Sequence, residues 1–592
     1  MSLSSPVRHC TRALVGGALL VVLCAPALAA AQEAGPVTVR IDGIGGELRR
    51  NVEQRVGIIQ KTRGVDLLEV RIRELHASAA AEIRSALQPF GYYRPEITSS
   101  LDRERGVWTA RYRVRAGEPV PYASVELELV GPGSDDPVLA SELAGYPVRS
   151  GQPLRHVAWT RAKETLLHRA TARGYLDAAF AEHWVDVDLD EYEARAVLRL
   201  ETGPRYRFGG VRFEGTHFDR RLLDRFVPFE EDDPFLLEQL LAVQLGLGSS
   251  PYFRTVELST LRDEASDLRI PVVVSLEHRA RTGVSAGAGY GTDSGARGTL
   301  TWDRRWLGEG GDRLHGELRV SLARRTASGT YIVPVGRRAD DEVALTLAGQ
   351  DDESLEDARS RQLQASVGYA HTRGGWRETV SLGINSEWSE VGNLRSRSTL
   401  VLPGIAWSRS RSDDAVVPTR GSSLSLRLTG THEALVSDVS FARAHLRARV
   451  VRSPVQRGRI IARLDVGAVV VDEFATLPVS HRFFAGGDQS IRGFAFGAVG
   501  PTNAEGDVVG GRYLATASAE YEHYVVGPVG VAVFADVGNA FGPLSGRLSL
   551  ERGVGTGLRW RSPIGPVKLD VAWALTREGD PVRLHFNVGA GL

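Results

Sequence analysis

Apolar and polar residues alternate along a series of short segments in the second half of this 592-residue chain. The pattern is clearest in residues 314–322, 363–369, 380–384, 424–428 and 582–592. An alternation of period two predicts β-strands with one apolar and one polar face. Strands whose apolar face meets lipid cannot leave an open edge, because the bilayer core offers the backbone no hydrogen-bonding partner. Residues 281–592 are therefore expected to close into an all-β transmembrane barrel of about 16 antiparallel strands.

The first 31 residues have the features of a secretory signal peptide. Two arginines precede an apolar stretch, Ala13–Leu28, which ends in small residues suited to a signal peptidase. A membrane anchor is the alternative, but the apolar run is short for one. Both cysteines, Cys10 and Cys24, fall in this segment. We therefore expect an exported mature chain without disulfides, thiol catalysis or thiolate metal sites.

Residues 36–118, 120–203 and 206–279 form three similar units. Each opens with a short strand, continues through two helical stretches and closes with two strands, which is an α+β pattern. An aromatic residue marks the break between helix and strand in every unit. These breaks are Phe90-Gly91-Tyr92, Arg173-Gly174-Tyr175 and Ser250-Pro251-Tyr252. The self-similarity predicts three repeated domains ahead of the barrel.

One segment of the barrel region, residues 482–494, does not fit a regular strand. It contains Gly486, Gly487 and Gly493, which allow backbone angles that other residues avoid. It also contains aromatic residues and Arg492, which are suited to anchoring a loop rather than to decorating it. The segment is therefore predicted to be a functional loop inside the barrel.

Signals for enzymes, metal sites and nucleic-acid binding are weak. The run Gly283-Val284-Ser285-Ala286-Gly287 matches the G-x-S-x-G pattern of serine hydrolases, but strand alternation continues past it where a hydrolase requires a helix. The 14 histidines include no H-E-x-x-H zinc motif. The net charge is zero and no basic block stands out, so nucleic acid is not an expected partner. We expect neither an enzyme nor a cofactor-binding protein.

Four motifs follow one another along the barrel region. They are Arg304–Asp312, Asp413–Gly421, Arg482–Phe494, and Phe534–Phe541 with Gly557–Pro566. Together they resemble, in their order along the whole barrel, the motifs of the bacterial surface antigen superfamily, the outer-membrane assembly factors of the BamA and TamA type. The three N-terminal units resemble the POTRA domains of that family. The resemblance thus implies POTRA 1, 2 and 3 in the three units, followed by an outer-membrane barrel.

In that family the Arg-Gly-aromatic tip of an inward loop pairs with an acid on the barrel wall. Asp536 and the nearby Gly538 are the candidate anchor, because an acid on this strand is tolerated only facing the lumen. A guanidinium such as that of Arg492 could pair with it bidentately. The alternative is that both charges are hydrated separately. The resemblance assigns the functional loop to Gly486, Gly487, Asp488, Ile491, Arg492, Gly493 and Phe494.

The first and last strands of the barrel are expected to meet at a seam that can open sideways. Glycine weakens strand pairing, and both strands are rich in it. The candidate seam residues are Gly283, Gly287, Gly289, Gly589 and Gly591. Ordinary use of glycine in a tightly curved barrel explains them equally well.

The resemblance implies an outer-membrane protein of a Gram-negative bacterium with its POTRA domains in the periplasm. Three units favour the TamA subfamily, since BamA usually carries more and two-partner secretion transporters carry fewer. The implied function is insertion or translocation of client proteins such as autotransporters, with a large inner-membrane-anchored periplasmic protein (TamB-like) as partner. The POTRA domains would dock partners by strand addition, or serve only as spacers. Two-partner polypeptide secretion and inter-membrane phospholipid handling are the alternatives.

Overall fold

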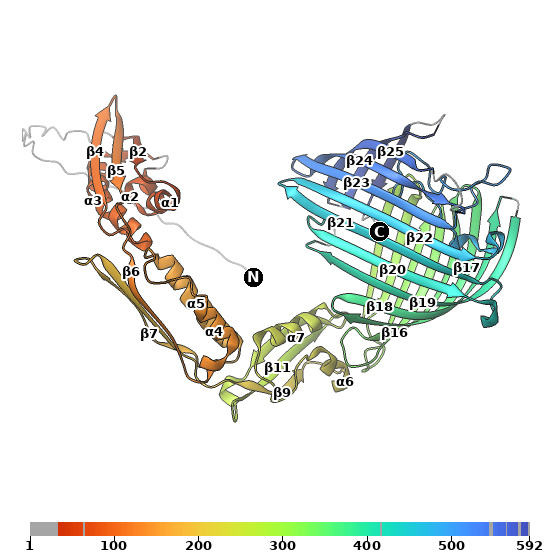
Figure 1. Ribbon diagram of the computed structural model, residues 1–592, viewed down its shortest axis with the longest axis horizontal. Helices are drawn as coiled ribbons and strands as arrows, with labels where there is room; N and C mark the ends of the chain where they lie inside the picture. Colours follow the sequence, from red (N-terminus) through yellow and green to blue (C-terminus); the bar gives the residue numbers. More distant parts are fainter. Residues whose placement is uncertain are drawn as a thin grey trace, which may run out of the picture. The chain divides into compact units, whose positions relative to one another are not determined.

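The computed structural model describes residues 34–62, 65–392, 394–414, 417–543, 549–563, 565–577 and 582–589. The expected leader (residues 1–31) and the candidate seam residue Gly591 lie outside these ranges. The chain divides between Arg205 and Tyr206 into two compact units (Figure 1). The first unit holds two of the repeats, and the second holds the third repeat and the barrel. No helix among the described residues is long and apolar enough to cross a membrane.

The first repeat is a three-stranded sheet covered by helices. Its elements are β1 (Ala34–Gly35), β2 (Val37–Asp42), α1 (Gly46–Arg55), α2 (Gly57–Lys61), β3 (Leu67–Leu68), α3 (Glu69–Leu87), β4 (Glu96–Glu104) and β5 (Val107–Arg115). The strand order is β2-β5-β4, with β2 parallel to β5. Helix α3 buries Ile72, Leu75, Ala79 and Ile83, whose spacing places them on one face toward the sheet. The sequence pattern predicts a helix only around Ala79–Leu87, which is the second half of α3.

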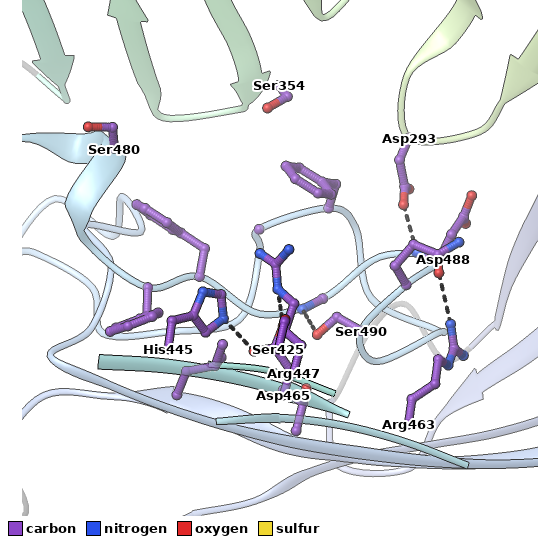
Figure 2. Close-up of a pocket in the computed structure, with 18 of the residues that line it drawn as sticks. Asp293, Ser354, Ser425, His445, Arg447, Arg463, Asp465, Ser480, Asp488 and Ser490 are labelled. Carbon is purple, nitrogen blue, oxygen red and sulfur yellow. Dashed lines mark hydrogen bonds and ion pairs between the residues drawn. The ribbon is translucent and has the colours of Figure 1, made fainter. Parts of the chain in front are cut away.

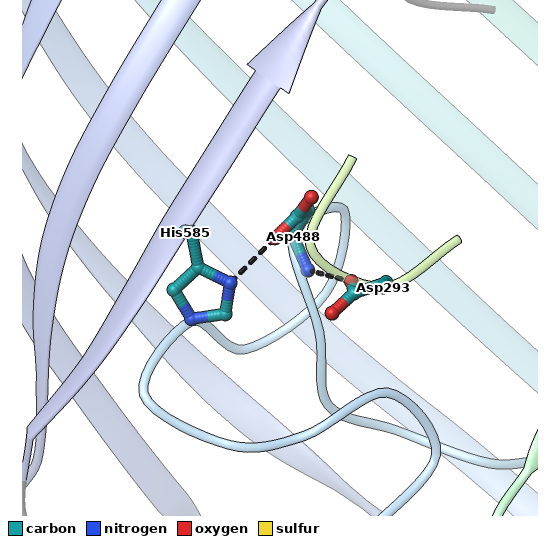
Figure 3. Close-up of side chains that lie close together, drawn as sticks. All are labelled: Asp293, Asp488 and His585. Carbon is teal, nitrogen blue, oxygen red and sulfur yellow. Dashed lines mark hydrogen bonds and ion pairs between the residues drawn. The ribbon is translucent and has the colours of Figure 1, made fainter. Parts of the chain in front are cut away.

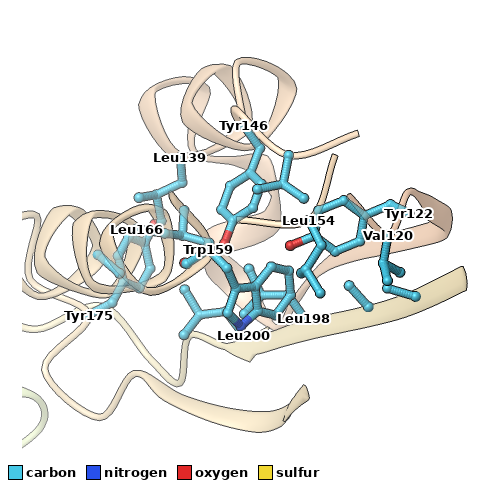
Figure 4. Close-up of a cluster of buried hydrophobic side chains, with 14 residues drawn as sticks. Val120, Tyr122, Leu139, Tyr146, Leu154, Trp159, Leu166, Tyr175, Leu198 and Leu200 are labelled. Atoms are coloured by element: carbon cyan, nitrogen blue, oxygen red, sulfur yellow. Dashed lines mark hydrogen bonds between the residues drawn. The ribbon is translucent and has the colours of Figure 1, made fainter. Parts of the chain in front are cut away.

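The second repeat has the same plan. Its elements are β6 (Tyr122–Val130), α4 (Pro137–Ala144), α5 (His156–Ala172), β7 (Ala179–Asp188) and β8 (Glu193–Glu201), with strand order β6-β8-β7. Trp159 and Leu166 of α5 pack on Leu198 and Leu200 of β8 in the core (Figure 4). Asp136 caps α4 by accepting from the Val138 and Leu139 amides, which satisfies two donors that the helix leaves unpaired.

The third repeat packs directly against the turns on one rim of the barrel. It consists of β9 (Arg207–Glu214), α6 (Arg220–Leu223), α7 (Leu237–Ser249), β10 (Phe253–Thr260) and β11 (Arg269–His278), with strand order β10-β11-β9. The Tyr252 hydroxyl donates to the Gly311 carbonyl at 2.8 Å. Arg225 donates to the carbonyls of Arg338 and Asp341 at 2.7 and 2.5 Å. These bonds fix the last repeat to the first two turns on that rim.

Strands β12 to β27 form a closed barrel in which all neighbours are antiparallel, so the expectation of about 16 strands is confirmed for the described residues. The strands are β12 (Thr282–Gly291), β13 (Gly295–Arg304), β14 (Arg313–Ser321), β15 (Arg324–Pro334), β16 (Glu342–Leu355), β17 (Ala358–Arg373), β18 (Trp376–Val391), β19 (Leu394–Ser412), β20 (Gly421–Thr431), β21 (Phe441–Val455), β22 (Gly458–Val471), β23 (Tyr513–Val526), β24 (Val529–Phe541), β25 (Glu551–Ser562), β26 (Gly565–Ala574) and β27 (Val582–Val588). On β18, Val380, Leu382 and Ile384 are exposed outward, whereas Asn385 and Glu387 are buried inside. An apolar outer face and a polar lumen are what a bilayer requires.

The pH dependence of the first unit follows from two half-buried histidines. Burial lowers the pKa of His76 and of His156 below the usual 6.5. Each shares a 2.8 Å hydrogen bond with a tyrosine, Tyr112 and Tyr93 respectively. Because the folded state disfavours the charged form, their contribution to stability is present above about pH 6.5 and is lost as the pH falls toward the folded pKa.

We therefore expect the thermal midpoint of residues 34–205 to fall between pH 7.5 and pH 5.5. The double variant His76→Gln/His156→Gln should show a flatter pH dependence, as measured by circular dichroism melting. The variant Arg169→Gln, which removes a charge from the exposed last turn of α5, is the control. An unchanged slope in the double variant would contradict this assignment.

Candidate functional site

A long loop, residues 472–512, joins β22 to β23 and folds inside the barrel (Figure 2). It has its own backbone pairing. Phe483 and Gly511 exchange two hydrogen bonds of 3.0 and 2.7 Å, and Ala485 and Val499 exchange two of 3.0 and 2.9 Å. The loop is therefore an ordered structure and not a loose connection. Segment 482–494, singled out in the sequence, lies in its inner part.

Apolar side chains seat this loop against the wall. Phe483, Ile491 and Phe494 are buried in a cluster with Leu400 and Val469 from the strands. Gly467 of β22 leaves room for this packing, since a Cβ there would lie 2.2 Å from the Phe483 ring. Dispersion contacts and removal from water thus hold the loop before any charge is considered.

Arg492 lies at the tip and meets Asp536 of β24 bidentately. Its Nε donates to Oδ2 at 2.8 Å and its Nη2 donates to Oδ1 at 3.0 Å. The Arg492 backbone amide also donates to Oδ2 at 3.0 Å. Both residues are only 2% exposed, so water does not screen the pair. The charges are thus paired with each other rather than hydrated separately.

Two further carboxylates surround the same guanidinium. Arg492 Nη1 donates to Glu520 of β23 at 2.7 Å and to Asp570 of β26 at 3.3 Å. The guanidinium carbon lies 3.4 Å from the centre of the Phe534 ring, a cation–π contact. Arg492 therefore contacts three strands, β23, β24 and β26. Strand β25 runs between the last two.

A second arginine closes the network from the wall side. Arg559 of β25 donates to Glu520 at 2.8 Å, to Glu522 at 3.1 Å and to Asp570 at 2.5 Å. Glu520 and Asp570 each bridge the two arginines, one carboxylate oxygen to each. Every buried charge named here has an opposite partner, which is the condition under which such charges are tolerated.

Glycines allow the loop tip to approach the wall. Gly486, Gly487 and Gly493 all have a positive φ, between 97° and 104°. On the wall, a Cβ on Gly553 would lie 2.0 Å from the Arg492 carbonyl oxygen, and one on Gly538 would lie 2.3 Å from the Ala515 carbonyl oxygen. A side chain at Gly553 would therefore displace the loop tip.

Asp488, another of the predicted loop residues, contacts residues at the place where the first and last strands of the barrel meet. Its backbone amide donates to Asp293 Oδ2 at 2.6 Å, and its Oδ1 lies 2.5 Å from His585 Nδ1 (Figure 3). The Gly493 amide donates to His585 Nε2 at 3.0 Å. Ligand atoms of these two aspartates and the histidine lie within 4.8 Å of one another, but both ring nitrogens of His585 are engaged in hydrogen bonds.

Beside the loop lies a polar cavity of about 910 Å³ (Figure 2). Its wall on β21 and β22 includes Arg447, Arg463, His445 and Asp465. Asp465 pairs with His445 at 2.5 Å and with Arg447 at 3.5 Å. Arg463 donates to Gln489 of the loop at 3.0 Å. The lining of this part of the lumen is therefore polar, and the loop and the β21–β22 wall both contribute to it.

The candidate seam glycines lie where β12 meets β27. Among the described residues this register contains only the pairs Tyr290–Val588 and Gly291–Asn587. Gly289 faces the Val588 carbonyl, 2.7 Å from where its Cβ would be, so its missing side chain permits the close approach. The other described seam glycines behave differently: Gly287 borders open space, Gly283 borders the Arg305 side chain, and Gly589 has a φ of 106°.

Sequence reasoning missed Glu520, Asp570, Arg559, Asp293 and His585. Glu520, Asp570 and Arg559 lie on the lumen face of alternating strands, so the argument applied to Asp536 could have found them. Asp293 and His585 gave no comparable signal, because their role depends on how the barrel closes.

The comparisons with known proteins agree with this architecture. Residues 306–592 match the Omp85 superfamily domain, and residues 38–116 match the POTRA domain named TamA domain 1. The outer membrane protein assembly factor BamA of Nitratidesulfovibrio vulgaris is 32% identical over 133 residues, which are 21% of this chain and 17% of that protein. BamA of Neorickettsia risticii is 22% identical over 414 residues, 64% of this chain and 54% of that protein. The chain thus spans about half, or less, of the length of these curated relatives.

A solved structure gives the same fold. BamA from Haemophilus ducreyi lacking POTRA domains 1–3 superposes with a TM-score of 0.64 at 18% identity, covering 79% of this chain and 100% of that one. The likeness confirms the expected fold, POTRA-like α+β domains followed by a closed barrel. At this identity it carries no conclusion about activity.

Removing Arg492 should uncouple the loop from the wall. Arg492→Ala removes a cation that three buried carboxylates share, and the free energy of unfolding should fall by about 3–5 kcal/mol. Asp536→Ala should also lower the thermal midpoint of the barrel. This midpoint is measured by heat-modifiable gel migration. The double variant should add little to Arg492→Ala alone, because both changes remove the same interaction.

Arg449→Ala, which removes an exposed lumen arginine on β21, is the matched control and should leave the midpoint unchanged. If the losses from Arg492→Ala and Asp536→Ala were simply additive, the two residues would not be coupled.

Proposed function

From the premise that this chain carries an Omp85 superfamily barrel behind a TamA-type POTRA domain, we propose that it is an outer-membrane assembly factor. It promotes insertion or translocation of client proteins, with autotransporters as the proposed class. The POTRA domains lie in the periplasm and dock partners there. A large periplasmic protein anchored in the inner membrane, of the TamB kind, is the proposed partner for three POTRA domains.

The observation that carries the proposal is the short pairing at the barrel closure within the part of the chain that the structure describes. Strands β17 and β18 pair along their whole length, from Ala358–Val391 to Arg373–Trp376. The described part of β12–β27 contains two residue pairs. Where a sheet edge is unpaired, its backbone groups can pair with an added strand, and we propose that this closure is where a client strand adds. A client strand can add there with its apolar face toward the lipid and its polar face toward the lumen. Transfer of the apolar face from water into lipid then drives the insertion.

Loop anchoring supports the same function. A loop held by a buried ion network keeps the lumen filled, so clients are directed to the seam and not through the pore. The rival function, polypeptide secretion through the lumen, requires this loop to leave. Phospholipid handling requires neither the loop nor a client strand, so it is tested separately below.

A disulfide across the seam tests the function directly. Tyr290→Cys with Val588→Cys joins register partners, which lie at the spacing that disulfides require. Cys10 and Cys24 are replaced by alanine. In proteoliposomes, the oxidised protein should lose most of its ability to fold an autotransporter barrel, scored by heat-modifiable migration, and reduction should restore it.

The matched control is Val367→Cys with Leu382→Cys, a pair across β17 and β18. Oxidation there should have no effect. Normal client folding by the seam-locked protein would refute the proposed function. In the same vesicles, ion conductance and lipid transfer are measured, and a seam lock that changed only lipid transfer would favour phospholipid handling.

A further inference from the structure

The loop tip contacts both sides of the seam. Asp293 lies in the turn that follows β12, and His585 lies on β27. Asp488, from the loop between β22 and β23, is bonded to each of them, at 2.6 Å and 2.5 Å (Figure 3). These are the two sides that must separate for the barrel to open.

Among the described residues, the direct bonds across the seam are few. Besides the two register pairs, the Thr292 amide and hydroxyl donate to the Phe586 carbonyl at 2.9 and 3.3 Å, and the Phe586 amide donates to the Thr292 hydroxyl at 2.7 Å. Arg297 reaches Asn587 and Val588 at 3.3 Å each. A bridge through Asp488 is therefore a substantial part of what joins the described ends of these strands.

The contacts of Asp488 are also sheltered and directional. The His585 side chain is 3% exposed and that of Asp488 is 13% exposed. His585 is oriented from its other side, because Nε2 accepts from the Gly493 amide. Gly493 follows Arg492 in the chain. The wall network that fixes Arg492 therefore also fixes the Gly493 amide, which orients the His585 ring. A hydrogen bond to a charged group in such a place is stronger than one in water.

We propose that Asp488 is a positioning residue that latches the seam, so that β12 and β27 separate only when the loop tip releases Asp293 or His585. Client insertion is thereby coupled to loop movement: the loop both fills the lumen and controls the edge. The inference rests on the proposed function, in which the seam opens, but it concerns the resting barrel and can be tested without any client.

Spin labels on the outer face report seam separation. Val284 on β12 and Leu584 on β27 are exposed to the outside and take the labels, with Cys10 and Cys24 replaced by alanine. Distances are measured by pulsed electron paramagnetic resonance on the full-length protein in nanodiscs. Asp488→Ala should raise the population with a long distance about tenfold, as loss of one charge-assisted hydrogen bond implies.

Conservative variants separate latching from general support. Both Asp488→Ala and Asp488→Asn keep the backbone bond to Asp293, but only Asp488→Asn keeps an acceptor for His585, so it should restore most of the short distance. Asp293→Ala cuts only the other half of the latch and should open the seam as Asp488→Ala does; it carries the test if Asp488→Ala fails to fold. Asp465→Ala, a lumen carboxylate bonded to His445 and Arg447, is the matched control and should leave the distances unchanged.

Unchanged distances in both Asp488→Ala and Asp293→Ala would overturn the latch, as would equal opening in Asp465→Ala. A chelator should have no effect, and opening caused by EDTA would overturn the hydrogen-bonded latch in favour of a metal. The latch and the proposed function fail separately. A seam that opens in the variants while the disulfide lock leaves client folding normal would refute only the function.

Discussion

One buried cation organises the inner wall of this barrel. Arg492 is 2% exposed and pairs with Asp536, Glu520 and Asp570, and a second arginine, Arg559, pairs with the last two of these carboxylates. Taken singly, each of these charges would be costly to bury, and here each has an opposite partner. The network exists only when the loop tip is in place, so the fold of β23 to β26 and the position of the loop depend on each other.

The same tip reaches the barrel closure from its other edge. Asp488 and Gly493 stand on either side of the segment that ends in Arg492, and both meet His585. A displacement of the tip from the wall therefore changes the seam as well. The loop therefore connects the barrel wall to the barrel closure. The apolar cluster around Phe483 packs against the loop, and the ion network fixes the position of its tip at the wall.

How far the sequence could predict this structure depended on the range of the interactions. Period-two alternation is a local property, so the barrel and its approximate strand number followed from it, as did the strands of the three repeats. Asp536 was accessible because an acid on an alternating strand has one tolerable direction. Glu520 and Asp570 obey the same rule and were overlooked. The start of α3 was missed because its first half carries polar residues between the buried Ile72 and Leu75. Asp293 and His585 are 292 positions apart, and only closure of the barrel brings them to Asp488.

The central claim is that loop anchoring and seam closure are coupled through the tip. Hydrogen–deuterium exchange of the intact protein carrying Gly553→Ala tests it most directly, because the added methyl would lie 2.0 Å from the Arg492 carbonyl oxygen and touches neither seam strand. Gly298→Ala, whose methyl meets open space, is the control. The account predicts faster exchange in both residues 483–499 and β27, with β18 still protected. Faster exchange in the loop alone, with β27 unchanged, would contradict it.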